Sequence, residues 1–276
     1  APQGPRQERQ LTGFGLSVFL YTFQQRFRQV IDFGCWSFSC MNFPVTGKGL
    51  EMNVSRILAP VAFVVLSASP ALAIPSISIA PGDSPAGGYL PLSLFGIAPV
   101  AGMGDETIIN FTTPSFVFGG ETWGSVGISS NGYLKVGGAT GADSASINTA
   151  LPDTSAPKNI LAPFWTDLDF SLGGAFRIGT LTDGVDTWLV SDWDGVHGFG
   201  SPEAYSFQIW IGVNGIEDIT FTYGPLGALP ANLTVGAQDA SGTVGDTWYY
   251  NGTGAAPFNG LQLRVSSLDL PVDVPE

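Results

Sequence analysis

The chain has 276 residues, 44% hydrophobic and only 12% charged, with 37 Gly and 20 Pro. Its 23 Asp and Glu outnumber its 10 Lys and Arg, and the net charge of −13 argues against binding to phosphate backbones. One His and two Cys exclude His- or Cys-rich zinc sites. An aromatic fraction of 12% argues against a disordered chain. This composition favours an acidic, glycine-rich, extracellular β protein.

Residues 52–73 have the pattern of a secretory signal peptide. Met52 is followed by an apolar run over residues 57–68, and the segment closes with Ala71-Leu72-Ala73. Small residues at this spacing are typical of a signal-peptidase site, and the apolar run is short for a membrane span. An uncleaved anchor or a buried helix is the alternative interpretation. We therefore expect the mature protein to begin after Ala73.

Residues 1–51 differ in composition from the rest of the chain and contain both cysteines. We expect them to be an upstream segment that is not part of the native fold. The alternative is a genuine N-terminal segment in which Cys35 and Cys40 pair or react. Without residues 1–73, 4 basic and 20 acidic residues remain, which gives a net charge of −16 and no cysteine. Bound cations would relieve the repulsion at that charge.

The mature part is predicted to be a single all-β domain, an antiparallel β-sandwich. Short β-rich runs alternate with Gly, Pro, Asn and Asp at the spacing of a sandwich. Asn131-Gly132, Asp183-Gly184 and Asn214-Gly215 provide residues suited to hairpin turns. The expected strands are residues 107–111, 125–129, 133–136, 161–165, 175–182, 187–193, 206–213, 219–223, 233–238, 247–251 and 261–265.

Three segments divide the mature chain. Residues 74–104 are rich in Gly and Pro and are expected to form an extended leader or an edge strand. Residues 105–266 form the sandwich, and residues 267–276 form a Pro-rich, acidic tail. Along residues 206–211 the apolar side chains alternate with polar ones and with Trp210, which indicates a strand with one apolar face. Trp210 is then expected on the opposite, exposed face.

Several stretches resemble nidogen-like extracellular β domains. They are FVFGGETWGSVGISSNGYL at residues 116–134, LAPFWTDLD at 161–169, YSFQIW at 205–210 and VGAQDASG at 235–242. The part from Gly88-Tyr89-Leu90-Pro91-Leu92 through Gly104-Asp105-Glu106-Thr107-Ile108 is also similar to accessory domains that trail bacterial subtilisin-type serine peptidases. The resemblance covers about residues 86–266 and implies the sandwich fold and a non-catalytic appendage. No protease domain precedes the module in this chain.

The last residues, Val272-Asp273-Val274-Pro275-Glu276, resemble the beginning of a PEP-CTERM sorting tail. A chain with such a tail would be truncated here, and the native protein would be tethered to the envelope of a Gram-negative bacterium. A Pro-rich, acidic linker is the alternative interpretation. Reading the gene beyond codon 276 would distinguish the two.

Catalytic residues are hard to find. The chain has no G-x-S-x-G nucleophile elbow and no subtilisin-type motif. His197 is its sole histidine, and Ser191, Asp192 and Asp194 precede it closely. These residue types serve acyl transfer when they meet in space. The alternative is a solvated loop histidine, and the residues favour a protein that is not an enzyme.

Two Asp-x-Asp pairs, Asp167/Asp169 and Asp192/Asp194, are the candidate metal ligands. On a strand, residues two apart share a face, so each pair would bring two carboxylates together. Such a pair suits Ca²⁺, which prefers oxygen ligands, and is also the residue type of glycosidases. The alternative is that the four carboxylates only cap turns. Calcium is the one cofactor that the sequence predicts.

Aromatic residues near expected loops are candidate stacking surfaces for sugar rings, although such residues more often pack in the core. The candidate ligand-binding residues are Trp193, Trp210, Trp248, Tyr249 and Tyr250.

The main functional hypothesis is a secreted or surface-tethered, non-catalytic module for adhesion or for association with an extracellular matrix or exopolysaccharide. Its partner would be an extracellular protein or a polysaccharide, with no nucleic acid and no membrane insertion after signal removal. The second hypothesis is a secreted hydrolase using His197 or an Asp pair. The third is a filament subunit, in which residues 74–104 add to a neighbour's sheet.

Overall fold

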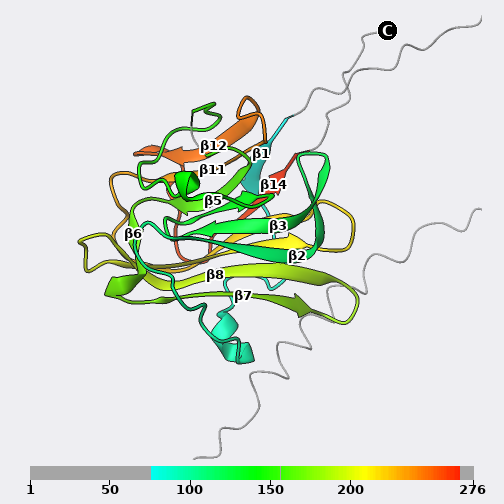
Figure 1. Cartoon of the computed structure of the whole chain (residues 1–276), viewed down its shortest axis with the longest axis horizontal. Coiled ribbons are helices and arrows are strands. Elements are labelled where there is room, and N and C mark those ends of the chain that lie inside the picture. Colours follow the sequence, from blue (N-terminus) through cyan, green and yellow to red (C-terminus); the bar gives the residue numbers. More distant parts are fainter. Residues whose placement is uncertain (1–75, 156, 268–276) are drawn as a thin grey trace, which may run out of the picture. The chain divides into compact units, whose positions relative to one another are not determined.

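The computed structural model describes residues 76–155 and 157–267 (Figure 1). Two antiparallel sheets, each of seven strands, make up this part of the chain. The all-β, antiparallel sandwich expected from the sequence is confirmed. The upstream segment 1–51, the signal peptide 52–73 and all of the tail but its first residue lie outside the described residues.

The first sheet has the N-terminal strand at one edge. At its other edge, two strands pair with different parts of one long strand. Both β6 and β7 pair with β8, and β1 pairs with β14 from Ser78↔Ser266 to Pro81↔Leu263. The order is β1 (Ser78–Pro81), β14 (Gln262–Ser266), β10 (Ile219–Leu226), β9 (Ala204–Gly212), β8 (Thr187–Gly198) and β6 (Leu168–Asp169), with β7 (Ala175–Thr182) also on β8.

The second sheet includes the strands of two resemblance stretches, residues 116–134 and 235–242. Its order is β13 (Thr253–Gly254), β12 (Gly245–Tyr250), β11 (Thr234–Gln238), β5 (Ile160–Trp165), β4 (Tyr133–Val136), β3 (Glu121–Ser129) and β2 (Ile108–Phe118). Three short 3-10 turns complete the described elements: η2 (Leu92–Phe95), η3 (Gly141–Asp143) and η4 (Phe170–Leu172). Every strand expected from the sequence is present, β1 lies in the segment for which an edge strand was one alternative, and β6 and β13 are additional.

The three expected hairpin turns have the backbone that their glycines permit. Gly132, Gly184 and Gly215 have φ of 77°, 94° and 84°, in the left-handed region that a Cβ disfavours. Gly132, in the turn between β3 and β4, also lies very close to the end of β5. A Cβ there would lie 2.0 Å from the carbonyl oxygen of Phe164. The resemblance motifs around residues 130–134 and 161–169 therefore pack directly against each other.

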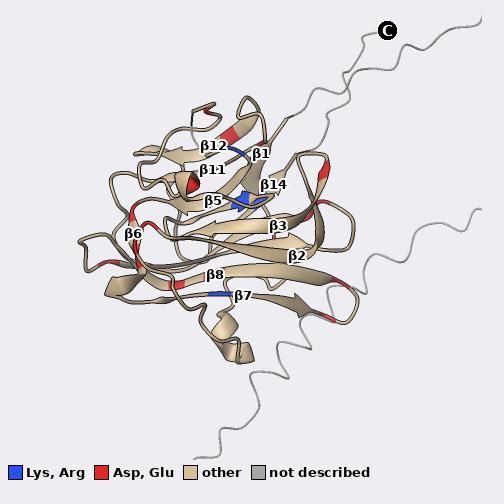
Figure 2. Cartoon of the chain, in the orientation of Figure 1, with Lys and Arg blue, Asp and Glu red and all other residues tan. Residues whose placement is uncertain are grey.

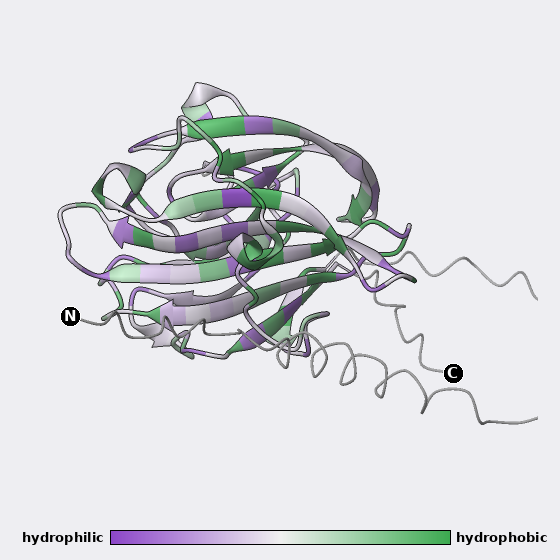
Figure 3. Cartoon of the chain, turned by 90° about the horizontal axis from the view of Figure 1, so that it is seen from below, coloured by the Kyte–Doolittle hydropathy of each residue, from purple (hydrophilic) through white to green (hydrophobic). Residues whose placement is uncertain are grey.

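An aromatic cluster joins the two sheets across the core. Phe164 of β5 stacks on Phe207 of β9 with ring centroids 5.1 Å apart, and Phe207 stacks on Trp193 of β8 at 5.1 Å. Phe176 of β7 meets Trp193 edge-on at 4.9 Å. Alternate residues of these strands point into the core, which Figure 3 shows as green and purple bands along the strands. Burial of such rings is the main stabilising contribution of the sandwich.

The outer face of the first sheet is covered by a segment that we call the N-terminal arm, residues 78–103. It starts as edge strand β1, beside β14 in Figure 1, and then crosses the sheet. Ile97 reaches Gly179 on β7, and the N–H of Val100 donates to the carbonyl of Phe176 at 2.8 Å. Of the two alternatives for residues 74–104, the structure contains the edge strand.

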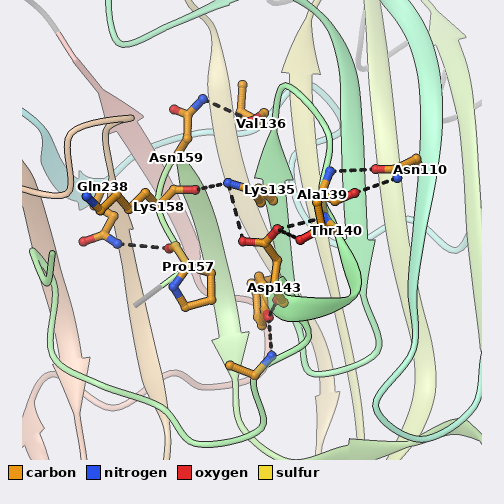
Figure 4. Close-up of polar contacts among 12 residues, drawn as sticks. Asn110, Lys135, Val136, Ala139, Thr140, Asp143, Pro157, Lys158, Asn159 and Gln238 are labelled. Carbon is orange, nitrogen blue, oxygen red and sulfur yellow. Dashed lines mark hydrogen bonds and ion pairs between the residues drawn. The ribbon is translucent and has the colours of Figure 1, made fainter. Parts of the chain in front are cut away.

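The outer face of the second sheet is covered by residues 137–155 and 157–159. The side-chain amide of Asn110 on β2 pairs with both the N–H (2.8 Å) and the carbonyl (2.9 Å) of Ala139, and Lys135 Nζ donates to the carbonyl of Lys158 at 3.0 Å (Figure 4). Asn159 Nδ2 donates to the carbonyl of Val136. Because both outer faces are covered, most strand residues near the middle of the sheets are buried on both sides.

Candidate functional site

The residues considered for acyl transfer do not meet. Ser191 and Asp192 are neighbours on β8 and so point to opposite faces of the sheet. Ser191 is 1% exposed, and its Oγ has no hydrogen-bond partner. His197 lies beyond the irregularity between Trp193 and Val196, opposite Asp169. The strand thus turns Ser191 away from Asp192, which weighs against the alternative of an acyl-transfer site built from Ser191, Asp192, Asp194 and His197.

Asp192 and Asp194 do share a face, as their spacing predicts, but other groups of the protein occupy their oxygens. Asp192 accepts from the Tyr89 hydroxyl at 3.0 Å and from the Leu92 N–H at 2.9 Å. Asp194 accepts from Arg177 Nη1 at 2.8 Å. This pair fastens the N-terminal arm, and its assignment as calcium ligands stays a prediction that would require these hydrogen bonds to be replaced.

Burial affects the protonation of Asp192 and Tyr89. Asp192 is fully buried, and burial raises its pKa to about 6 against the favourable hydrogen bonds from Leu92 and Tyr89. Burial, together with the charges of Asp192 and Asp194, raises the pKa of Tyr89 far above its usual value. Tyr89 therefore remains a neutral donor between two carboxyl groups.

The two residues of the other Asp-x-Asp pair have different contacts. Asp169 is 5% exposed and caps η4 by accepting from the Ser171 N–H and hydroxyl at 2.7 and 2.8 Å. Asp167 instead joins Asp105 and Glu106, and one carboxylate oxygen from each lies within 4.8 Å of the others. These three form the carboxylate cluster. Sequence reasoning missed Asp105 and Glu106 as ligands, although both stand in a stretch quoted for the resemblance.

The carboxylate cluster has the chemistry of a cation site. Partial burial, with repulsion from Glu106, Asp105 and Asp169, raises the pKa of Asp167, and burial and repulsion from Asp169 and Glu106 also raise that of Asp105. Asp167 Oδ1 is buried and has no hydrogen-bond partner. Hard oxygen ligands of this kind suit Ca²⁺. Among the described residues it is the one cluster of at least three His, Cys, Asp or Glu close enough to share an ion.

A cleft of about 710 Å³ opens beside Asp167, between loops at one end of the strands. We call it the end cleft. Ile147 and Phe199 line it although they are 82% and 57% exposed, and Asp167 and Glu203 bring carboxylates to it. Its lining residues are Ser146, Ile147, Asn148, Thr166, Asp167, Gly198, Phe199, Ser201, Glu203, Tyr205, Ala228, Leu229, Pro230, Ala231, Asn232, Tyr250 and Asn251.

Side-chain amides hold the loops of the end cleft in place. Asn251 Oδ1 accepts from the Leu233 N–H at 2.9 Å and from Asn148 Nδ2 at 2.8 Å, and Asn148 Nδ2 also donates to Thr234 Oγ1. Asn131 accepts from the Leu168 N–H at 3.0 Å and donates to Glu106 at 3.2 Å. The cleft is therefore formed before any ligand arrives.

Among the residues that the structure describes, no basic side chain lines the end cleft. The described residues contain Lys135, Lys158, Arg177 and Arg264 as their Lys and Arg, and Figure 2 shows how few basic residues stand among the acidic ones. Three of the four pair elsewhere: Lys135 with Asp143 at 3.7 Å, Arg177 with Asp194 at 2.8 Å and Arg264 with Asp218 at 2.6 Å. Among the described residues, no basic side chain therefore neutralises the carboxylates that line the cleft.

The aromatic candidates divide between core and cleft. Trp193 is fully buried in the aromatic cluster, and Trp210 is 2% exposed with its Nε1 donating to Gln208, so both assignments as ligand platforms are corrected. Trp210 does face away from the core, as its alternation predicts, but the outer face is covered. Trp248 is half-buried against the core and Tyr249 is 8% exposed. Tyr250 lines the end cleft and stays a prediction.

One comparison identifies the family. A family model described as NIDO related matches residues 93–265. The chain belongs to this family. The match confirms the nidogen-like resemblance and does not extend to subtilisin-type peptidases or to a PEP-CTERM tail. No curated protein and no solved structure shows significant similarity to this NIDO-related chain. Across the part of the chain that the structure describes, no helix has the length and apolar character needed to span a membrane.

Proposed function

We propose that this NIDO-related chain is a secreted or surface-tethered, non-catalytic interaction module that binds an extracellular partner in the end cleft. The observation that carries the proposal is a preformed cleft in which exposed apolar side chains, Ile147 and Phe199, stand beside uncompensated carboxylates. Exposed apolar groups with a polar surround are typical of binding surfaces. The separation of Ser191 from His197 and Asp192 supports a role without catalysis.

The lining favours a protein partner that presents Lys or Arg next to an apolar side chain. Glu203 would pair with its cationic group, and Phe199 and Tyr250 would pack on its apolar part. A polysaccharide that stacks on Tyr250 is the second class of partner. Adhesion or association with an extracellular matrix is the corresponding role, at the surface of a Gram-negative bacterium.

Calcium belongs to the same proposal. The carboxylate cluster shares Asp167 with the end cleft, so an ion held by Asp105, Glu106 and Asp167 would stabilise the rim. Relief of repulsion among these carboxylates supports the assignment.

The test is binding of the full chain to two immobilised panels, one of peptides with Lys or Arg beside aromatic residues and one of neutral and acidic polysaccharides. We expect peptide binding that Phe199→Ala weakens about tenfold. Phe258→Ala is the matched control, because Phe258 is 61% exposed and does not line the cleft. Equal effects of the two variants would refute the end cleft as the binding surface. Binding to polysaccharides alone would change the partner class, and release of cleaved product would overturn the non-catalytic role.

A further inference from the structure

The N-terminal arm is held to the first sheet by a series of side chains that bond to its backbone. Gln262 Oε1 accepts from the Ser84 N–H at 2.7 Å, and Arg264 donates to the carbonyl of Asp83 at 2.9 Å. Further along, Gln208 pairs with Leu90, and Asp192 accepts from the Leu92 N–H. All of these anchors lie on β14, β9 and β8, so the sheet provides a continuous binding track for one extended segment.

Side chains of the arm also pack closely on glycines of the sheet. The Tyr89 ring lies over Gly224 of β10, where a Cβ would come within 2.6 Å of it, and Ile97 lies over Gly179 of β7, where a Cβ would come within 2.8 Å. Trp210 faces outward, is 2% exposed, and donates its Nε1–H to Gln208, the residue that pairs with Leu90 of the arm. If the arm left, this part of the sheet would be exposed to water, so the track requires an occupant.

The connection from the arm to the rest of the sandwich is short and strained. Met103 packs on the core, and Thr107 is fixed to Ser130 by hydrogen bonds of 2.8 and 3.0 Å, which leaves residues 104–106 between them. Glu106 has φ of 48°, a left-handed conformation that a residue with a side chain seldom adopts. Its carboxylate and that of Asp105 are also held next to Asp167.

We propose that this arm exchanges between two copies of the chain, so that each arm occupies the other copy's track in a reciprocal dimer. An exchanged arm would make every contact described above, and only residues 104–106 would change conformation. Short connections under strain favour such exchange, because the extended form releases the strain. The left-handed Glu106 and the crowded carboxylates would both relax when the connection extends. This inference does not need a ligand in the end cleft, but exchange would move Asp105 and Glu106 away from Asp167, so calcium held by the carboxylate cluster would oppose it.

A disulfide across the pair Ser78↔Ser266 tests the exchange, because these two residues are partners on β1 and β14. The full chain with Ser78→Cys and Ser266→Cys, in a Cys35→Ser, Cys40→Ser background, would be concentrated in reductant, oxidised and separated by size. We expect a dimer fraction that runs at twice the chain mass on non-reducing gels. The matched control is Thr182→Cys with Thr187→Cys, partners within the β7–β8 hairpin, whose disulfide stays within one chain.

A second variant tests whether strain at Glu106 causes the exchange of the arm. Glu106→Asn should lower the dimer fraction severalfold in light scattering, because Asn tolerates the left-handed conformation and removes one charge from the connection. Glu121→Asn, the same change at the start of β3, should leave the fraction unchanged. A chain that stays monomeric at every concentration, or a dimer whose Ser78→Cys/Ser266→Cys disulfides all lie within single chains, would overturn the exchange.

Discussion

The side-chain amide of Gln208 binds the backbone of Leu90 at both of its polar groups, accepting from the N–H at 3.1 Å and donating to the carbonyl at 2.6 Å. The same Oε1 also accepts from Trp210 Nε1 at 3.0 Å. One buried glutamine thus replaces the strand neighbour that this part of the N-terminal arm lacks.

Replacing Gln208 by Leu should therefore destabilise the sandwich. Leu90 would lose both partners, Trp210 Nε1 would lose its acceptor, and the free energy of unfolding should fall by about 3 kcal/mol. Urea unfolding of the two proteins measures this. Asn214→Ala is the control, since its hydrogen bond to Asp186 is exposed and its loss should cost less than about 0.5 kcal/mol. A Gln208→Leu protein as stable as the parent would contradict the role of this amide.

Asp192 makes stability depend on pH in an unusual direction for a carboxyl group. Its pKa is about 6 in the folded protein and 3.8 in an unfolded chain, so the folded state binds the proton more tightly. The contribution of this group is most favourable below pH 3.8 and is lost as the pH rises to about 6. Over that window the parent should lose about 3 kcal/mol relative to Asp192→Asn, which carries no charge at any pH. Urea unfolding at several pH values measures the difference, and parallel curves would refute it.

Two turn glycines should respond differently to the same substitution. Gly132→Ala places a Cβ 2.0 Å from the Phe164 carbonyl oxygen, whereas Gly215→Ala has nothing within 4 Å. Both have positive φ, so each should lose about 1 kcal/mol from backbone strain alone. Gly132→Ala should lose at least about 3 kcal/mol, because the turn and Phe164 must move apart. Thermal unfolding compares them, and equal losses would show that the close approach costs nothing.

Calcium should raise the melting temperature if the carboxylate cluster binds it. At ten times its dissociation constant a ligand adds about 1.4 kcal/mol, which corresponds to about 3 °C for a domain of this size. Calorimetry of the full chain in millimolar-range CaCl₂ and in EDTA measures the shift. Asp167→Asn should abolish it, and Glu121→Gln, an exposed change outside the cluster, should preserve it. An identical melting temperature in both buffers would remove calcium from the proposal.

The strands could be predicted from the sequence because their signals are local. The three Asn-Gly or Asp-Gly turns locate hairpins directly, and alternation places Phe207, Ile209 and Ile211 on one face. Alternation cannot tell whether the opposite face is covered. Trp210 looked exposed on this basis, but the N-terminal arm lies over that side of the sheet, and the sequence of this covering segment has no regular period by which to recognise it.

The candidate site depended on contacts between distant parts of the chain. Asp167 meets Asp105 and Glu106 because the β3–β4 turn holds both segments: Asn131 bonds to Glu106 on one side and to the N–H groups of Thr166 and Leu168 on the other. Asp192 and Asp194 share a face as predicted, yet the groups that donate hydrogen bonds to them, Tyr89 and Arg177, come from elsewhere in the chain. Residue type and spacing indicated carboxylate chemistry, and tertiary packing decided which carboxylates remain available.

The end cleft has a consequence for how new specificity could arise in this fold. Most of its lining, including Ile147, Phe199 and Asn232, belongs to connections between strands rather than to the aromatic cluster of the core. Substitutions at such positions change a surface while leaving the packing that holds the sheets together. A library randomised at these loop positions would therefore sample many recognition surfaces on one stable framework, as the hypervariable loops of other β-sandwiches do.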